Sequence, residues 1–286
     1  MDKTLVGIVS FGNTPFTKLT VDSIRKTTES PIDFFIVVGK PGDSETLNWL
    51  ATEPDIKFKV HTQNWGFPCS INDVYDYAWL ENNYDNLIIA GNDIVAYPYA
   101  IDSLIKLADE STYQVISASQ VDVRAFASQF PDARKFFKSD KYIFSDFGSS
   151  PWELFKDYSN ILDINHMQLL DIQNLCLYKR GVFDGVGYTD VAFYPAYFID
   201  NDYANRIVRA NIKSCSLTNA KFFHFWSRTI NQGSGGSTNA AFDNNKSYYV
   251  SKWGGEVGKE TANPPIKIDS REEELSTINY WRNKLH

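Results

Sequence analysis

Short apolar runs alternate with stretches of helical periodicity through about the first 95 residues of the chain. The runs are typical of buried parallel strands and end at turn-forming residues; they cover residues 5–10, 34–38 and 86–90. Apolar residues at helical spacing lie between these runs and predict helices that open near Thr14, Asp43 or Ser44, and Ile71. This order predicts a doubly wound α/β sheet with right-handed crossovers.

A further strand is expected at residues 56–60, where apolar and polar residues alternate. Ile56, Phe58 and Val60 are expected to face the core, whereas the lysines between them and His61 are expected to point outward. We therefore expect one buried and one solvated face on this strand, and we assign His61 no role.

The second half of the chain has a less regular pattern. Strands are expected at residues 115–119, 174–178 and 221–226, and a helix at 202–209. Residues 232–238 (QGSGGST) are typical of a flexible segment, and a charged helix is expected at the C-terminus. No internal repeat interrupts this order.

The bulk composition indicates one large globular domain with an appendage. The chain has 286 residues, 43% of them hydrophobic, and a formal net charge of −7 that disfavours a polyanionic partner without excluding a local basic groove. Three unpaired cysteines are typical of reduced thiols and favour a cytoplasmic location. No stretch is long enough for a signal peptide or a membrane span, so we expect no integral membrane association.

The chemistry is expected where the strands end, because ligands of open α/β sheets lie outside the carboxyl ends of the strands. Neither a dinucleotide fingerprint nor a P-loop is present. Asn92 and Asp93 follow the strand at 86–90, and a carboxylate there can bind Mg²⁺ or Mn²⁺ together with a diphosphate. The triplet that begins at Gly91 is also ordinary turn chemistry, which is the more frequent explanation for these residues alone.

Two further positions carry candidate chemistry. Asp200 and Asp202 follow an aromatic run, where desolvation would raise the pKa of a general base; either residue could instead cap the helix that follows. His224 lies within an apolar strand, and such a histidine is more often a satisfied core residue than a ligand. Both explanations remain open for each position.

Taken together, these segments resemble the family 2 glycosyltransferases and their rhamnosyltransferase-like relatives, which have the GT-A fold. The resemblance extends from about Leu5 to Gly255 and rests on LVGIVSFGNTPF, QNWGFPCSIND, LIIAGND, GVFDGVG with FIDNDYANRIVR, and NNKSYYVSKWGG. The second strand of the family commonly ends in an acid that contacts the base or ribose. Here Gly39 stands there, so that contact is missing or is supplied by Asp43.

The resemblance implies a role for each matching residue. Asp200 corresponds to the catalytic base, with Asp202 as its partner at the start of the helix, and Asp93 with His224 corresponds to the site of a divalent metal, Mn²⁺ or Mg²⁺. The expected acceptor and lid residues are Trp226, Arg228, Lys252 and Trp253. The expected donor-binding residues are Ser10, Phe11, Asn13, Asp43, Asn64, Gly66, Asn72, Asn92 and Asp93.

The resemblance thus implies a GT-A fold with a nucleotide-sugar-binding half (residues 1–112), an acceptor-binding half of the same domain (113–230) and a C-terminal extension (231–286). Its expected reaction is metal-dependent, inverting transfer of a sugar from a nucleotide-sugar, UDP-sugar favoured, to a glycan or to hydroxymethylated phage DNA. One alternative is a non-catalytic carbohydrate-binding protein. Another is a nucleotidyltransferase, although the segment after the first strand lacks the Gly-rich, basic loop that grips a triphosphate.

Overall fold

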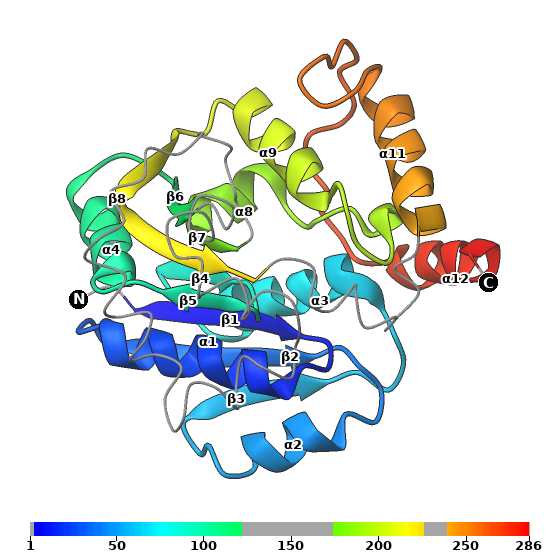
Figure 1. Ribbon diagram of the computed structural model, residues 1–286. Coiled ribbons are helices and arrows are strands. Elements are labelled where there is room, and N and C mark those ends of the chain that lie inside the picture. The colour runs from blue at the N-terminus through cyan, green and yellow to red at the C-terminus, as the bar shows by residue number, and fades with distance from the viewer. Residues whose placement is uncertain (1–2, 122–173, 226–238, 286) are drawn as a thin grey trace, which may run out of the picture.

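The computed structural model describes residues 3–121, 174–225 and 239–285 (Figure 1). An eight-stranded mixed sheet runs through the centre of this part of the chain, in the order β3-β2-β1-β4-β7-β6-β8-β5. The α/β fold expected from the sequence is confirmed.

The N-terminal half forms four parallel strands, β3-β2-β1-β4, joined by helices. The predicted strands and helices all occur, with Ile8 of β1 paired between Ile36 of β2 and Ala90 of β4. The elements are β1 (Thr4–Ser10), α1 (Thr14–Thr27), β2 (Ile32–Val38), α2 (Ser44–Leu50), β3 (Ile56–Val60), α3 (Gly66–Tyr75), its π-helical continuation η1 (Asp76–Glu81) and β4 (Asn86–Ala90).

The strand β3 differs from its prediction. Only Ile56 is buried, whereas Phe58 and Val60 are 43% and 41% exposed. The reason is that β3 is the edge strand and the helix α2 beside it is only seven residues long. Leu50 of α2 packs in the same core cluster as Ile56, but this cluster does not include Phe58 or Val60.

The second half of the domain adds four strands and several helices that the sequence pattern predicts only in part. β7 pairs antiparallel with β4 and β6, whereas β8 runs parallel to β6 and pairs antiparallel with β5. The elements are β5 (Ile94–Ala96), α4 (Ala100–Glu110), β6 (Val115–Val121), β7 (Leu175–Lys179), α8 (Arg180–Val186), η3 (Val191–Phe193), α9 (Ile199–Arg209) and β8 (Ser214–His224). The carboxyl ends of β1–β4, β6 and β8 therefore meet at one edge of the sheet.

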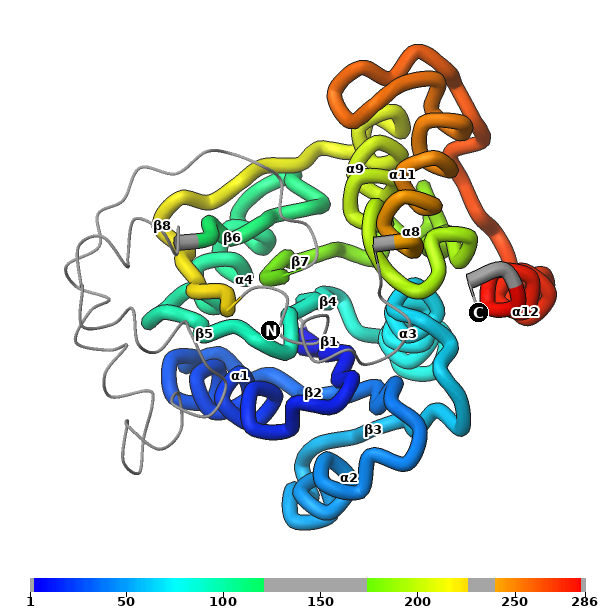
Figure 2. The backbone as a smooth tube through the Cα atoms, turned by 45° about the vertical axis from the view of Figure 1, so that its right-hand side comes forward, coloured from blue at the N-terminus to red at the C-terminus, as the bar shows by residue number. Residues whose placement is uncertain are grey.

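Two layers of helices cover the sheet (Figure 2). α1, α2 and α4 pack into one core cluster, and α3, α8 and α9 pack into a second cluster on the opposite face. The C-terminal helices α11 (Asn239–Trp253) and α12 (Glu274–Leu285) lie outside α9 and α3, at one end of the molecule (Figure 1). Within the described residues, no helix combines the length and apolarity that crossing a bilayer requires.

Candidate functional site

Asp93 and His224, far apart in the sequence, meet at the carboxyl edge of the sheet. The pairing of β5 with β8 places Ile94 opposite His224, and the backbone N–H of Phe225 donates to the carbonyl of Asp93 at 2.9 Å. As a result, Nε2 of His224 lies 3.1 Å from Oδ1 of Asp93. The two side chains are only 16% and 10% exposed.

The spacing of this pair fits two ligands of one metal ion. Two ligand atoms that each lie about 2.1 Å from a shared cation, at a right angle, are about 3 Å apart. Nδ1 of His224 lies 3.3 Å from Oε1 of Gln120, so that a proton on Nδ1 would leave the lone pair of Nε2 for a metal ion. Among the described residues, no cluster of three or more His, Cys, Asp or Glu side chains surrounds a metal position.

The turn between β4 and β5 is tied to the end of β1. Nδ2 of Asn92 lies 3.4 Å from Oγ1 of Thr17, whose hydroxyl lies 3.1 Å from Oγ of Ser10. Asn92 and Asp93 are both buried. The segment is therefore a turn, as its composition suggests, and it also presents Asp93 to His224.

Asn13 stands just before α1 in the left-handed backbone region, with φ at 59°. Its buried Nδ2 has no hydrogen-bond partner within the described chain. A buried donor without a partner carries a desolvation cost that an acceptor oxygen of a ligand can remove. Phe11, two residues earlier, lies beside Gly39, where an added Cβ would come within 3.4 Å of the ring.

Asp43, Asn64 and Gly66 shape loops at the same edge. The carboxylate of Asp43 accepts from the backbone N–H of Thr46 at 3.2 Å and from its hydroxyl at 2.6 Å, so the predicted cap of α2 is confirmed. Oδ1 of Asn64 accepts from the N–H of Gly66 at 2.9 Å. Gly66 has φ at 79°, and a Cβ there would lie 2.7 Å from the ring of Tyr194, so only glycine fits.

The expectation that Asn72 contacts the donor is wrong. Its side chain is fully buried; Nδ2 donates to Oε1 of Glu274 at 2.6 Å, and Oδ1 accepts from the N–H of Thr189 at 2.8 Å. Both ends of the amide are used inside the protein. The side chain joins α3 to the segment between α8 and η3 and to α12.

The two acids at the start of α9 lie in opposite environments. Asp200 is half-buried in the first turn, whereas Asp202 is fully buried. Asp202 Oδ2 accepts from Nε of Arg206 at 2.9 Å, and its Oδ1 accepts from Nε1 of Trp253 at 3.0 Å. The catalytic assignment of Asp202 is therefore corrected, because no acceptor can reach its carboxylate, and the N-cap position of α9 belongs to Phe198.

Lys252 and Trp253 are structural and do not face an acceptor, which corrects their predicted role. Nζ of Lys252 lies 2.7 Å from both Asp190 and Asp202, and Trp253 is fully buried. Burial alone would raise the pKa of Asp190, but the charge and hydrogen bond of Lys252 hold this pKa below its ordinary value. Two other predicted acceptor residues, Trp226 and Arg228, lie outside the described residues.

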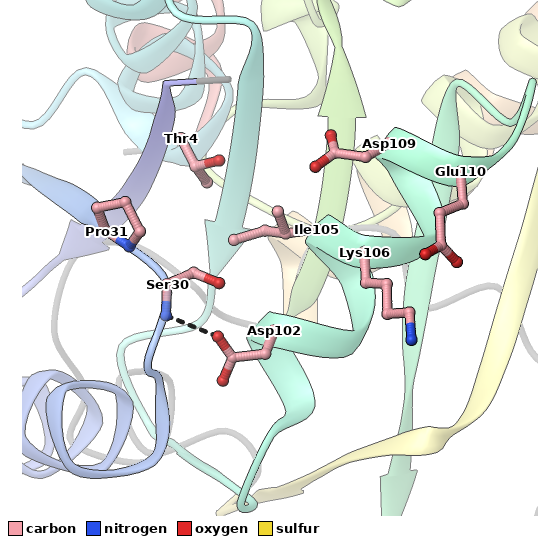
Figure 3. A pocket seen from close by; sticks show the side chains of 8 residues that line it. All are labelled: Thr4, Ser30, Pro31, Asp102, Ile105, Lys106, Asp109 and Glu110. Atoms are coloured by element: carbon pink, nitrogen blue, oxygen red, sulfur yellow. Dashed lines mark hydrogen bonds between the residues drawn. The ribbon is translucent and has the colours of Figure 1, made fainter. Parts of the chain in front are cut away.

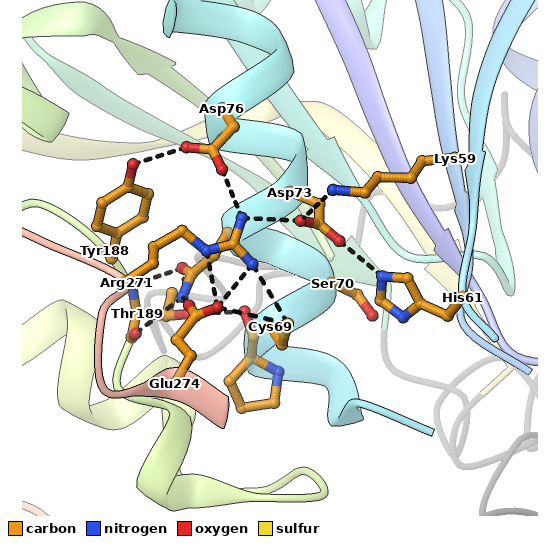
Figure 4. A network of polar contacts seen from close by, with 12 residues as sticks. Lys59, His61, Cys69, Ser70, Asp73, Asp76, Tyr188, Thr189, Arg271 and Glu274 are labelled. Atoms are coloured by element: carbon orange, nitrogen blue, oxygen red, sulfur yellow. Dashed lines mark hydrogen bonds and ion pairs between the residues drawn. The ribbon is translucent and has the colours of Figure 1, made fainter. Parts of the chain in front are cut away.

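A buried ionic network beside the site was not foreseen (Figure 4). His61, expected to point outward, is 4% exposed, and its Nε2 lies 2.6 Å from Oδ2 of Asp73 on α3. The expectation fails because β3 ends at Val60, and the alternation of a strand does not extend past its last residue. Nζ of Lys59 and Nη1 of Arg271 each lie 2.7 Å from the other oxygen of Asp73.

Arg271 extends this network to the C-terminal helix. Its Nη1 also pairs with Asp76 at 2.5 Å, and its Nη2 pairs with Glu274, the first residue of α12, at 2.7 Å. The network therefore fastens α12 to α3. No local pattern in the sequence predicts this network, because its partners lie far apart in the chain.

A cavity of about 210 Å³ lies at the opposite, amino-terminal edge of the sheet, between β1 and α4 (Figure 3). Its central acid, Asp102, accepts hydrogen bonds from the backbone N–H of Ser30 at 2.8 Å and of Glu29 at 3.1 Å. Asp102 thus fastens the α1–β2 loop to α4. The cavity contains none of the residues that the resemblance implies.

The chain resembles glycosyltransferases in its sequence and in its fold. No protein-family model matches the chain. A galactofuranosyl glycosyltransferase from Leishmania donovani is 23% identical over 206 residues, which are 66% of this chain and 47% of that protein. The chain thus spans about half the length of this curated relative.

Solved structures extend the likeness over more of the chain. The mannosyltransferase PcManGT from Pyrobaculum calidifontis, in complex with GDP-Man and Mn²⁺, superposes with a TM-score of 0.56 at 13% identity, over 98% of this chain and 69% of that one. TarS 1–349 from S. aureus gives 0.51 at 12% identity, over 78% and 60%, and its complex with UDP gives 0.52 at 11% identity, over 77% and 60%. The fold is therefore the GT-A fold, as the resemblance implied.

Proposed function

We propose that this protein is a metal-dependent glycosyltransferase that takes its sugar from a nucleotide-sugar. The observation that carries the proposal is the Asp93–His224 pair, 3.1 Å apart at the carboxyl edge of a GT-A sheet. Relatives whose names state mannosyl or galactofuranosyl chemistry, and solved complexes with GDP-Man or UDP, support it.

Asp93 and His224 would hold a divalent cation, Mn²⁺ or Mg²⁺, which supplies positive charge to the diphosphate leaving group when bound. Asn92 and Ser10 keep the turn that carries Asp93 in place through Thr17. Asn13 presents a buried N–H donor that suits an oxygen of the donor substrate. A nucleotide-sugar therefore lies along the ends of β1, β4 and β5 in this proposal, with UDP-sugar as the favoured donor.

Asp200 is the proposed general base. Its carboxylate takes the proton of the acceptor hydroxyl, the acceptor oxygen forms a bond to the anomeric carbon, and the bond from that carbon to the diphosphate oxygen breaks. The nucleoside diphosphate leaves with the electron pair of the broken bond. Attack from the face opposite to the leaving group inverts the anomeric centre, which is the outcome that we propose.

Metal and nucleotide binding test this proposal without knowledge of the acceptor. Calorimetry with Mn²⁺ and UDP, and with GDP for comparison, is expected to show nucleotide binding that depends on the metal. Asp93→Asn or His224→Ala removes one ligand, and we expect the affinity for Mn²⁺ to fall at least ~10–100-fold.

Asp102→Asn is the matched control, because it removes the same charge from a part-buried carboxylate at the opposite edge of the sheet. This variant is expected to bind Mn²⁺ and nucleotide as the wild type does. Nucleotide binding that is equally strong without metal, or Mn²⁺ affinity unchanged in both ligand variants, would contradict the proposed site.

A further inference from the structure

The β3–α3 loop, residues 61–65, is held by a side chain from the last helix of the chain. Arg282 of α12 donates from Nη1 to Oε1 of Gln63 at 2.8 Å and from Nη2 to the backbone carbonyl of Asn64 at 2.7 Å. Its guanidinium carbon also lies 5.3 Å from the ring centroid of Trp65. One arginine of the C-terminal extension thus contacts three consecutive residues of a loop that lies far away in the sequence.

An arginine is suited to fixing the shape of a loop. Its guanidinium is planar and directs its N–H groups along fixed directions, and it can stack on an aromatic ring at the same time. β3 is the edge strand of the sheet, so the loop that follows it has a neighbouring strand on one side only. Loops with few such neighbours open at a small cost in free energy, and a contact from α12 raises that cost.

The β3–α3 loop is connected in space to the ends of β1 and β2. Oδ1 of Asn64 accepts from the backbone N–H of Gly66, whose carbonyl accepts from Oγ of Ser70 at 2.9 Å. A Cβ added to Gly39, which follows β2, would lie 3.4 Å from this Oγ and equally far from the ring of Phe11, which follows β1. A displacement of the loop would therefore be felt where the proposed donor site begins.

The loop is also packed against the second half of the domain. Trp65 belongs to one apolar cluster with Tyr194 and with Ile278 of α12. The backbone N–H of Phe67, in the first turn of α3, donates to the carbonyl of Pro195 at 2.7 Å. The loop therefore contacts α12 and residues 194–195 as well as the strand ends.

An unsatisfied atom at the start of the loop points to a ligand on this side of the sheet. Nδ1 of His61 is buried and has no hydrogen-bond partner within the described chain, as is also true of Nδ2 of Asn13 beyond the end of β1. Buried polar atoms of this kind are costly unless a ligand or water supplies the partner. The two atoms follow β3 and β1, the two neighbours of β2 in the sheet.

We propose that Arg282 is a positioning residue of the proposed donor site, and that through it the C-terminal helix α12 sets the affinity for the nucleotide. The inference rests on the proposed function. Arg282 acts through the β3–α3 loop, which it holds in the conformation that receives the donor. A nucleotide that binds only this conformation binds more weakly in proportion to the fraction of molecules in which the loop is released.

Calorimetry with UDP, and with GDP for comparison, at saturating Mn²⁺ tests the proposal on Arg282→Ala. We expect the nucleotide affinity to fall ~10-fold, as it would if the loop were held in about one tenth of the molecules. The affinity for Mn²⁺ alone should not change, because Asp93 and His224 belong to the β5–β8 pair. Arg282→Lys should restore part of the loss, since an ammonium group can still donate to the carbonyl of Asn64.

Hydrogen exchange shows whether the loop is the part that changes. The amides of Gly66 and Phe67, which donate to Asn64 and Pro195, should exchange at least ~10-fold faster in Arg282→Ala. Addition of UDP with Mn²⁺ should slow them again, because the nucleotide selects the held conformation. Amides of the central strands should keep their wild-type rates.

Two control variants match Arg282→Ala. Arg180 donates to Oδ1 of Asn83 at 3.2 Å and lies at the amino-terminal edge of the sheet, because the preceding Lys179 pairs with Asn86 at the start of β4. Tyr280 is on α12 itself and is 59% exposed. Arg180→Ala and Tyr280→Ala should both bind UDP with the affinity of the wild type.

The outcomes separate this inference from the proposed function. If the wild type binds UDP or GDP with Mn²⁺ and Arg282→Ala binds it equally well, the positioning role is wrong while the proposed function stands. The role is also wrong if exchange accelerates throughout the sheet in Arg282→Ala, because the weaker binding then reflects a general loss of stability. If the wild type binds neither nucleotide, both proposals are wrong.

Discussion

Two carboxylates at the start of α9 illustrate how burial separates residues that look equivalent in the sequence. Asp200 is half-buried, whereas Asp202 is enclosed by Arg206, Lys252 and Trp253. In the proposed function the first exchanges a proton with the acceptor, whereas the second neutralises buried cations. Substitution of the two acids should therefore have opposite effects on activity and on stability.

Asp200→Asn is expected to lower the transfer rate ~10²–10⁴-fold, as loss of a general base does, with an unchanged free energy of unfolding. Asp202→Asn should instead lower the free energy of unfolding by about 3–5 kcal/mol, because it leaves the fully buried Arg206 without its countercharge and Lys252 with Asp190 alone. Urea unfolding and donor turnover, measured on both variants, check this split. An unstable Asp200→Asn or a stable Asp202→Asn would show that the roles are reversed.

Local sequence patterns indicate those residues of the proposed site that follow a strand, but not the contacts that depend on distant partners. Asp93 could be found because it stands at the end of an apolar strand, and His224 because it matches a family position. Asn72 matches the family as well, yet Glu274 and Thr189 occupy its amide. Burial by a segment about 200 residues away leaves no trace in the pattern around Asn72.

At the scale of elements, the buried acid Asp73 is one of the residues that attach the helix α3 to the C-terminal segment. Burial would raise the pKa of Asp73, but hydrogen bonds from His61 and Lys59 and the charge of Arg271 hold the pKa well below its usual range. A carboxyl group whose pKa is lower in the folded state stabilises the protein above its unfolded pKa of about 3.9. That contribution is lost as the pH falls below this value toward the folded pKa.

Asp73→Asn should therefore lower the free energy of unfolding at pH 7 by about 2–4 kcal/mol and flatten its dependence on pH below about 5. Urea unfolding from pH 7 down to pH 3 measures both effects. Asp55→Asn, at an exposed acid (61%), is the control and should keep the slope of the wild type. Equal acid sensitivity in Asp73→Asn and the wild type would exclude this role for Asp73.

The predicted helices and strands were right where the apolar pattern of the sequence is strong. They were incomplete where the contacts of a segment with distant strands determine its structure. β1, β2 and β4 are uninterrupted apolar runs, and the structure has them almost as expected. β5, by contrast, has only three residues and exists because β8 pairs with it. β8 starts at Ser214, ahead of the expected 221, because its first residues are only partly buried and carry little apolar signal.

At the scale of the whole molecule, the site edge of the sheet is assembled from both halves of the chain and supported from outside by the C-terminal helices. α11 fixes α9 through Asp202, and α12 fixes α3 through Asp73 and Asn72. The order of the N-terminal strands could be predicted because each βαβ unit is local. The attachment of α9 and α3 to the C-terminal helices could not be predicted, because it depends on buried charges that pair only after the chain has folded.

The C-terminal extension should therefore be part of one cooperative unit with the GT-A domain. Ile278 on α12 is fully buried against Cys69, Val191 and Tyr194, so Ile278→Ala should lower the free energy of unfolding by about 2–5 kcal/mol. Leu275, on the same helix, is 58% exposed, and Leu275→Ala should change it by no more than about 0.5 kcal/mol. Urea unfolding followed by tryptophan fluorescence and by circular dichroism should give one shared, shifted transition for Ile278→Ala; a separate early transition would mean that α12 unfolds independently of the domain.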